Sequence, residues 1–176
     1  TITCGLMTAL SRRGLVVQPF KCGPDFLDAM HHEAAIDAGV AQETTSLKSL
    51  NRKTINLDGW MMGGKSAIID SFLRHSQQAD VCIIEGCMGL YDSKDGTSDD
   101  GSSAQIAKYL NASVLLVIDA GMMARSVAPM ALGYANYDPE VNLDAVVANK
   151  VGGSVHVQWI KEALEDLNLN TKLKEK

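Results

Sequence analysis

The chain has 176 residues, of which 46% are apolar and 21% charged, and its formal net charge is −5. Such values are typical of one soluble globular domain with a real core, and the negative charge excludes a broad nucleic-acid-binding surface. No window reaches the ~18 apolar residues that a membrane span needs, and the N-terminus does not resemble a signal peptide. We therefore expect a cytoplasmic protein that binds neither nucleic acid nor membrane.

The cysteines indicate a reducing compartment. There are four of them, Cys4, Cys22, Cys82 and Cys87, and none forms a CxxC pair. Zinc sites are usually built on such closely spaced pairs. We therefore expect reduced thiols and no structural zinc site.

The first predicted helix covers residues 1–12, because Ile2, Leu6 and Leu10 recur at a spacing of four. Gly14 follows as a signal for its end. The first predicted strand, residues 15–20, comes directly after this glycine and is rich in apolar and β-branched residues.

Lys21 stands at the end of this strand, and a Gly-Pro turn then presents Asp25. A lysine in this place could hold a phosphate as a point charge. A solvated surface lysine is an equally good interpretation of the same pattern.

A second helix is predicted over residues 28–38, and it carries the adjacent pair His31 and His32. Adjacent side chains point to different faces of a helix, so the pair makes a poor metal chelate. We interpret both histidines as surface or partner-contacting residues.

The segment 39–55 is polar and weakly patterned, which predicts a surface loop with at most one helical turn. Asp58 then has the place of an N-cap for a short helix. The Trp and Met residues after it are interpreted as core or groove lining. A further helix is predicted over residues 65–77.

A short apolar run, residues 81–84, predicts a fully buried strand that ends at Glu85. Open α/β sheets bind their ligands at the carboxyl ends of the strands. Asp92 lies seven residues on, and two carboxylates near one strand end suit a divalent cation, or the cation and a reacting group. The alternative is that Glu85 only caps the following loop.

That loop, residues 86–102, is rich in aspartate and glycine. The ligand spacing and the closing glutamate of a calcium loop are missing from it. We interpret it as a mobile active-site loop, and a plain disordered loop is the alternative.

The remaining predicted elements alternate between helix and strand. They are a helix at 103–110, a buried strand at 114–118 that ends at Asp119, a helix at 122–135 with Pro129 inside it, a strand around Val146 and Val147 that ends at Asn149, a helix at 154–167, and a polar tail that frays. Four strands that alternate with helices predict an α/β fold, a three-layer parallel sheet with helices on both faces. The functional acids fall at one edge of that sheet.

Five stretches together resemble the synthetase domain of the cobyrinate a,c-diamide synthase family. They are GLMTALSRRGLVVQPFKCGPDFLD, NLDGWMM, EGCMGLYDS with DGTSDDGSSAQIAKYL, GMMARSVAP and ANKVGG. The resemblance covers nearly the whole chain and implies a P-loop NTPase-like fold, similar to that of dethiobiotin synthetase. The PFKxGPD and EGxMGLYD stretches favour this family over cobyric acid synthase and dethiobiotin synthetase.

The resemblance implies a ligase of cobalamin biosynthesis that amidates the a and c carboxylates of cobyrinate, or of a related tetrapyrrole such as hydrogenobyrinate. ATP and Mg²⁺ would be the cofactors, and the reaction would pass through an acyl phosphate. Ammonia from glutamine, released in a glutaminase domain, would displace the phosphate. Such a step needs magnesium and cations to neutralise the phosphates.

Roles at the nucleotide end of the site follow from the same resemblance. Glu85 would bind magnesium, and Lys21 would contact the transferring phosphate. Thr1 would be either the magnesium-binding hydroxyl of the family's phosphate loop or the residue just after it. Asn149 would hydrogen-bond the adenine.

Roles at the substrate end follow in the same way. Asp25, Phe26 and Leu27 would lie by the corrinoid carboxylate, and Phe26 stands where the family commonly has Tyr. Tyr91 would contact the substrate, and Asp92 would steer the substrate or ammonia.

The family places a glycine-rich phosphate loop directly before the helix that opens this sequence, and usually a glutaminase domain after the synthetase domain. We therefore expect residues 1–176 to be a single partial nucleotide-binding synthetase domain, with the first strand, the phosphate loop and the C-terminal glutaminase domain absent. An inactive truncated remnant, or a non-catalytic binding module of the same fold, is the alternative. A homodimer is one option for the assembly.

Overall fold

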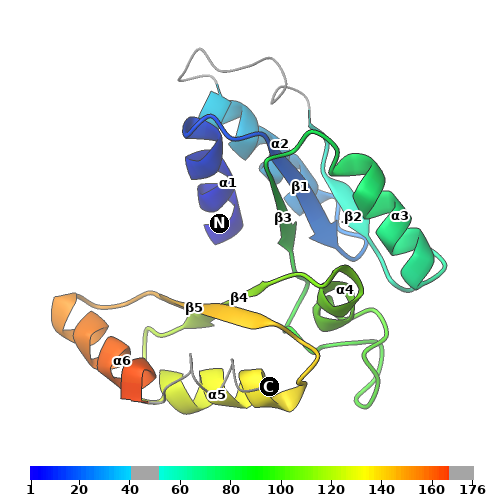
Figure 1. Cartoon of the computed structure of the whole chain (residues 1–176). Helices are drawn as coiled ribbons and strands as arrows, with labels where there is room; N and C mark the ends of the chain where they lie inside the picture. Colours follow the sequence, from blue (N-terminus) through cyan, green and yellow to red (C-terminus); the bar gives the residue numbers. More distant parts are fainter. Residues whose placement is uncertain (41–51, 167–176) are drawn as a thin grey trace. The chain divides into compact units, whose positions relative to one another are not determined.

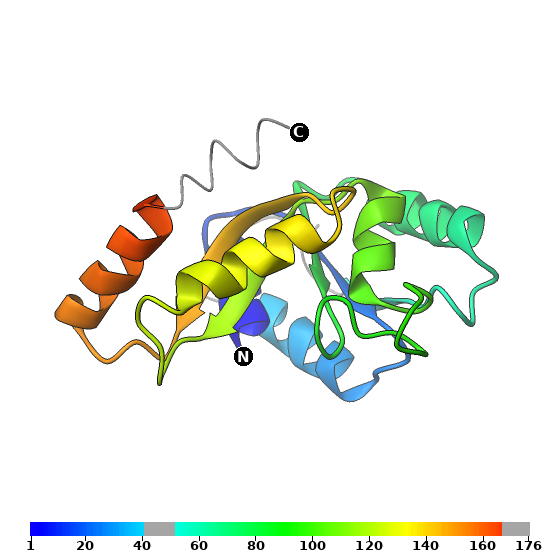
Figure 2. The same ribbon diagram turned by 90° about the horizontal axis from the view of Figure 1, so that it is seen from below.

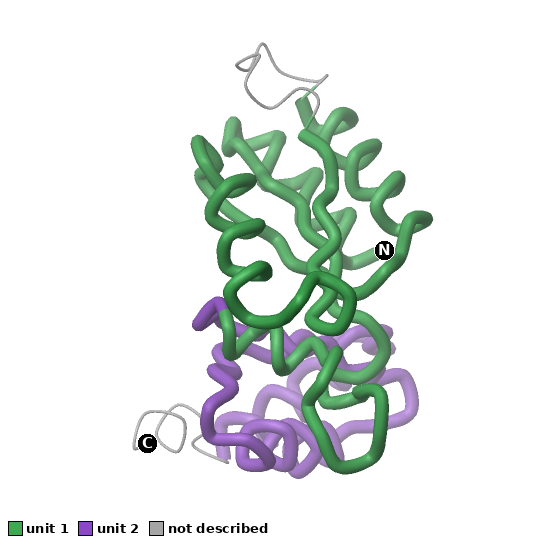
Figure 3. The backbone as a smooth tube through the Cα atoms, turned by 90° about the vertical axis from the view of Figure 1, so that its right-hand side faces the viewer, with its two compact units in different colours: residues 1–109 green, residues 110–176 purple. Residues whose placement is uncertain are grey.

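The computed structural model describes residues 1–40 and 52–166. The chain divides into two compact units, residues 1–109 and residues 110–176 (Figure 3). The elements are α1 (Ile2–Arg12), β1 (Val17–Cys22), α2 (Leu27–Val40), β2 (Ile55–Leu57), α3 (Lys65–His75), β3 (Val81–Glu85), α4 (Ser103–Leu110), β4 (Val114–Asp119), α5 (Val127–Tyr137), β5 (Leu143–Asn149) and α6 (Ser154–Asp166) (Figure 1). Among the described helices, none is both long enough and apolar enough to cross a membrane. Whether the chain is one partial synthetase domain stays a prediction.

Strand β1 is the centre of the first unit. The sheet has the order β2-β1-β3, and both pairings are parallel. All six residues of β1 are buried, because it has a neighbouring strand on each side and helices on both faces. The register places Lys21 opposite Asn56 of β2 and Glu85 of β3, so these three residues meet at the carboxyl end of the sheet.

Successive residues of β1 pack against helices on opposite faces of the sheet. Val17 packs in a cluster with Met7 of α1 and with Ile36 of α2. Phe20 points to the other face, where its ring lies 5.0 Å from that of Phe72 on α3. Because successive side chains of a strand alternate between faces, the sheet has α1 and α2 on one side and α3 on the other (Figure 1). This arrangement confirms the predicted parallel α/β fold.

Helices α1 and α2 approach each other closely at Gly39. A Cβ atom placed there would lie 2.6 Å from Cβ of Ser11 and 2.9 Å from the carbonyl oxygen of Thr8. The Thr8 hydroxyl also donates to the carbonyl oxygen of Ala35 across the two helices, at 2.9 Å. Glycine is therefore required for this helix pair to close.

The Gly39→Ala variant is expected to lower the free energy of unfolding by about 1–3 kcal/mol, because the new methyl group overlaps a backbone carbonyl. Gly5 on α1 is the matched control, since its added Cβ would have nothing within 4 Å. The Gly5→Ala variant is expected to gain up to about 1 kcal/mol from helix propensity. Denaturant unfolding measures both, and equal effects would contradict the close contact.

The second unit is a parallel pair, β4 and β5, in which Asp119 lies opposite Asn149. Helix α5 runs along the two strands (Figures 1 and 2). The core of this unit is a cluster of buried apolar residues from β4 and the residue after it, α5, β5 and α6: Leu116, Ile118, Ala120, Val127, Ala131, Leu143 and Ile160. The strand pair thus buries one face on these helices.

The strand predicted as fully buried, residues 81–84, and the strand predicted as buried, residues 114–118, are both partly exposed. The five residues of β3 are all half-buried, because β3 is an edge strand of the three-stranded sheet that the described residues form. Along β4 the burial alternates, and Leu115 and Val117 are each 45% exposed. An apolar run alone does not show whether both faces of a strand are covered.

Other element boundaries also differ from the prediction. The strand predicted at 15–20 lies two residues later. Strand β2 was not predicted, and only its first residue, Ile55, falls within the segment 39–55 that was interpreted as a loop. Residues 41–51 of that segment and the predicted tail lie outside the described residues. Asp58 accepts the backbone N–H groups of Trp60 and Met61, as a cap would, but only a single turn follows.

The helix predicted at 122–135 begins at Val127 instead. Pro129 explains the difference, because a proline ring clashes with the carbonyl four residues earlier and has no N–H. In the first turn of α5 neither property has a cost. The other predicted helices are confirmed within a few residues at each end.

Candidate functional site

Glu85 has hydrogen-bond donors on both carboxylate oxygens. Nε2 of His32 lies 2.6 Å from Oε2, and the Thr3 hydroxyl donates to Oε1 at 2.7 Å. The hydrogen bond from His32 is the main cause that lowers the pKa of Glu85 to about 2. An ionised carboxylate only accepts hydrogen bonds, so Nε2 of His32 carries the proton in this contact.

Lys21 is buried beside Glu85. Its side chain is 3% exposed, and its ammonium donates to the carbonyl oxygen of Gly86 at 2.6 Å. The Asp28 carboxylate lies 3.3 Å from the same nitrogen. The interpretation of Lys21 as a solvated surface lysine is therefore wrong, since a buried ammonium requires partners of this kind.

The loop after β1 is held from two sides. Nδ2 of Asn56 donates to the carbonyl oxygens of Gly23 and Asp25, at 2.6 and 3.0 Å. Oδ1 of Asp25 accepts the backbone N–H groups at the start of α2. The backbone hydrogen bond from Asp28 is the main cause that lowers the pKa of Asp25. The loop is thus fixed at the end of the sheet that carries Lys21 and Glu85.

Two large apolar side chains follow Asp25 without cover. Phe26 is 76% exposed and Leu27 is 74% exposed. Phe26 lies just before α2 and Leu27 is its first residue, directly after the carboxylate that caps the helix. An apolar ligand would find exposed apolar surface here. Their predicted contact with such a ligand stays a prediction.

The aspartate-rich loop closes on itself. Oδ2 of Asp92 accepts the N–H of Gly89 at 2.8 Å, and Lys94 pairs with Asp100. The Leu90 carbonyl oxygen accepts the N–H of Ala104 in α4. Tyr91 is half-buried within this loop, whereas Asp92 is exposed. Among the described residues no hydrogen bond joins Asp92 to Glu85, so their predicted joint role at a cation stays a prediction.

Thr1 precedes α1 and makes no capping hydrogen bond with its side chain. The threonine that contacts Glu85 is Thr3, one residue into the helix. The hydroxyl of Thr1 remains predicted as a magnesium ligand.

Asn149 ends β5 in the second unit, at the carboxyl end of the strand pair. The next residue, Lys150, has the left-handed conformation, with φ of 59°, and its ammonium pairs with Asp119 at 2.5 Å. Asp119 also accepts the N–H of Gly121. These contacts fix the residue that follows Asn149 and its register partner, Asp119. The contact of Asn149 with adenine stays a prediction.

The donor set of the first unit fits a magnesium nucleotide. The described residues hold no group of three or more His, Cys, Asp or Glu side chains that could bind a metal by themselves. Mg²⁺ does not need such a group, because it is usually bound through one or two carboxylates together with phosphate oxygens. Glu85 can supply an ionised oxygen, and the ammonium of Lys21 can face a phosphate.

Several residues of this site were not predicted as such. His32 was interpreted as a surface or partner-contacting residue, but it is 1% exposed and bonded to Glu85. His31, its neighbour, is exposed. Thr3, Asp28 and Asn56 were not assigned to the site at all. Asp28 and His32 are four residues apart on a predicted helix that follows Lys21, which is the sequence signal that could have found them.

The comparisons with known proteins agree with the motifs. The family model of the CobQ/CobB/MinD/ParA nucleotide binding domain matches residues 1–174. The cobyrinate a,c-diamide synthase of Syntrophotalea carbinolica is 44% identical over 93% of this chain and 32% of its own length. Those of Priestia megaterium and Archaeoglobus fulgidus are 38% and 41% identical, each over 94% of this chain and 33% of their own length.

The resemblance found in the sequence is thereby confirmed. The chain spans about a third of the length of these curated relatives. No solved structure gave a significant match.

Proposed function

This chain belongs to the CobQ/CobB/MinD/ParA nucleotide binding domain family, and from that premise we propose that it is the synthetase part of a cobyrinate a,c-diamide synthase. Its substrate would be a cobyrinate-type tetrapyrrole, and its product would carry amides in place of the a and c carboxylates. Support comes from the names of the relatives, which are 36–44% identical over at least 93% of this chain. The whole activity would also involve ammonia from a glutaminase domain.

One observation carries the proposal. A buried ammonium, Lys21, and an ionised carboxylate, Glu85, lie opposite each other at the carboxyl ends of neighbouring parallel strands. Open α/β sheets bind ligands at this edge. Transfer of a phosphoryl group depends on positioned positive charge and on a metal ion rather than on covalent chemistry by the protein. Lys21 would supply the positive charge, and Glu85 would supply a carboxylate for the metal ion.

The ligands would divide the chemistry as follows. ATP would supply the γ-phosphoryl group that turns the substrate carboxylate into an acyl phosphate, and Mg²⁺ would neutralise charge on the phosphates. Lys21 would hold the phosphoryl group that is transferred, and Glu85 would orient the metal. Thr1 would add a hydroxyl ligand to the metal, and Asn149 would recognise the adenine.

The substrate end of the site would use the loop after β1. Asp25 and Phe26 would lie against the tetrapyrrole, with Leu27 beside them. Because Asn56 binds two carbonyl groups of this loop, the loop would keep its shape when the substrate is absent. Tyr91 and Asp92 would complete the contact from the loop after β3.

The experiment uses the full-length gene product. Calorimetry with ATP and Mg²⁺ is expected to show one nucleotide site, and incubation with cobyrinate, ATP and glutamine is expected to give the diamide by mass spectrometry. A folded protein that binds no nucleotide would refute the proposal and favour a non-catalytic remnant or binding module. A protein that binds nucleotide but leaves cobyrinate unchanged would refute the proposed substrate and support nucleotide binding alone.

A further inference from the structure

We propose that His32 is a positioning residue, which holds the Glu85 carboxylate apart from Lys21 so that both charges stay available to a ligand. The consequence for metal and nucleotide rests on the proposed function, whereas the position of Glu85 does not. His32 would touch neither the substrate nor the phosphates, and it would act only through Glu85.

The contact between His32 and Glu85 is short and enclosed. The His32 side chain is 1% exposed and Nε2 lies 2.6 Å from Oε2. The Thr3 hydroxyl binds the other oxygen at 2.7 Å. Two donors from two different helices therefore define the plane of the carboxylate, which a single donor would leave free to turn.

The stability of the fold does not account for a histidine at this position. Nδ1 of His32 is buried and has no hydrogen-bond partner among the described residues. Burying a polar atom without a partner has a cost in free energy, and an apolar side chain of similar volume would avoid it. The hydrogen bond to Glu85 is the contact that a histidine makes here and an apolar side chain cannot.

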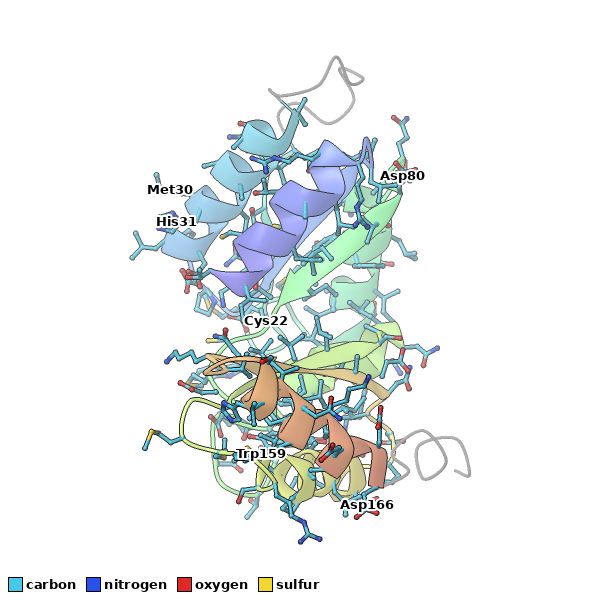
Figure 4. All side chains as sticks on the ribbon, turned by 90° about the vertical axis from the view of Figure 1, so that its left-hand side faces the viewer. Cys22, Met30, His31, Asp80, Trp159 and Asp166 are labelled. Carbon is cyan, nitrogen blue, oxygen red and sulfur yellow. The ribbon has the colours of Figure 1, made fainter. Side chains whose placement is uncertain are left out.

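Helix α2 carries a second polar residue, Asp28, that also contacts a charged residue at a strand end. Asp28 lies four residues before His32, so both side chains are on one face of the helix. Asp28 pairs with Lys21, and His32 binds Glu85. His31 and Met30 lie on the outer side of α2 (Figure 4). One helix face thus holds both strand-end charges, each by a partner of its own.

Without this support the two charges would neutralise each other. Lys21 and Glu85 are register partners, and neighbouring strands lie only ~4.8 Å apart. A Glu85 side chain released from His32 can turn towards the ammonium of Lys21 and form an ion pair with it. A metal ion would then compete with Lys21 for the carboxylate, and a phosphate would compete with Glu85 for the ammonium.

The test uses three variants of the full-length protein. His32→Leu removes the hydrogen bond and keeps the volume. His32→Gln places an amide N–H near the position of Nε2, so it restores the donor. His31→Leu is the matched control, since it makes the same change at the exposed neighbour.

Two measurements test this inference, and the first does not depend on the proposed function. Crystal structures without ligands are expected to show Glu85 within ion-pair distance of Lys21 in His32→Leu and in its original position in His32→Gln. An unchanged Glu85 in His32→Leu would overturn the inference, whether or not the protein binds nucleotide.

Calorimetry of ATP with increasing Mg²⁺ gives the second measurement. The affinity for Mg²⁺ is expected to fall by ~10–100-fold in His32→Leu, the range found when a hydrogen-bond partner of a metal ligand is removed. In His32→Gln the affinity is expected to recover to within about threefold of the wild-type affinity, and in His31→Leu it is expected to be unchanged. Equal losses in His32→Leu and His32→Gln, with lowered melting temperatures in both, would show a structural role and contradict the proposal.

Discussion

The Lys21→Met variant is expected to lower the rate constant of cobyrinate amidation by about 10²–10³-fold, the range found when one donor to a developing charge is removed. Methionine keeps the length and the apolar stem of the side chain and removes only the ammonium. The loss should be in kcat more than in the affinity for ATP, because Lys21 would hold the phosphoryl group most tightly while it is transferred. Formation of ADP with cobyrinate, at saturating ATP, measures it.

Lys53→Met is the matched control for Lys21. The Lys53 side chain is 73% exposed and pairs with Glu33 at 2.7 Å, and exposed ion pairs of this kind contribute about 0–1 kcal/mol. Its activity is expected to stay within about twofold of the wild type, because a change of that size in stability leaves the folded population intact. If Lys21→Met were as active as Lys53→Met, the Lys21 pairing with Asp28 would be a structural ion pair and the proposed phosphate contact would be wrong.

The sequence predicts Lys21 and Glu85 because their positions follow from local rules. Each comes at the end of an apolar run, and Lys21 is followed by a Gly-Pro turn. Because parallel sheets bind ligands at the carboxyl ends of their strands, the two residues are predicted to lie at the same site. Their side-by-side register in the structure agrees with that reasoning.

The partners of Glu85 could not be predicted in this way. Thr3 and His32 are 82 and 53 residues away from it in the sequence, and no local pattern links them. Their contacts follow from the packing of α1 and α2 on one face of the sheet. The outward direction of His31 and the inward direction of His32 depend on the same packing.

Strand β2 was missed for a related reason. It has three residues, Ile55–Leu57, which is too short for a periodic signal. Its pairing with β1 supplies the backbone hydrogen bonds that make it a strand. Burial of β3 and β4 was overestimated because an apolar run reports composition, and only the sheet order shows which strand is at an edge.

The Glu85→Gln variant is expected to lower the affinity for Mg²⁺ in the presence of ATP by at least ~100-fold, beyond the 10–100-fold range for a partner of a metal ligand. The amide has the shape of the carboxylate but no charge, and Mg²⁺ prefers ionised oxygen ligands. Its oxygen can still accept from His32, and its NH₂ group can donate to the Thr3 hydroxyl, which also accepts hydrogen bonds. The fold should therefore lose only about 0.5–1.5 kcal/mol of stability.

Glu33→Gln makes the same chemical change at a site of similar burial, since the Glu33 side chain is 26% exposed and that of Glu85 is 22% exposed. Glu33 lies on the same helix as His32, but its partners are Lys53 and the N–H of Thr54. Calorimetry is expected to show unchanged binding in this control. Should Glu85→Gln bind magnesium and ATP like Glu33→Gln and instead unfold at a much lower temperature, Glu85 would serve to tie α1 and α2 to the sheet. Because a ligand role reduces affinity and an anchoring role reduces stability, the two measurements on one variant distinguish the roles.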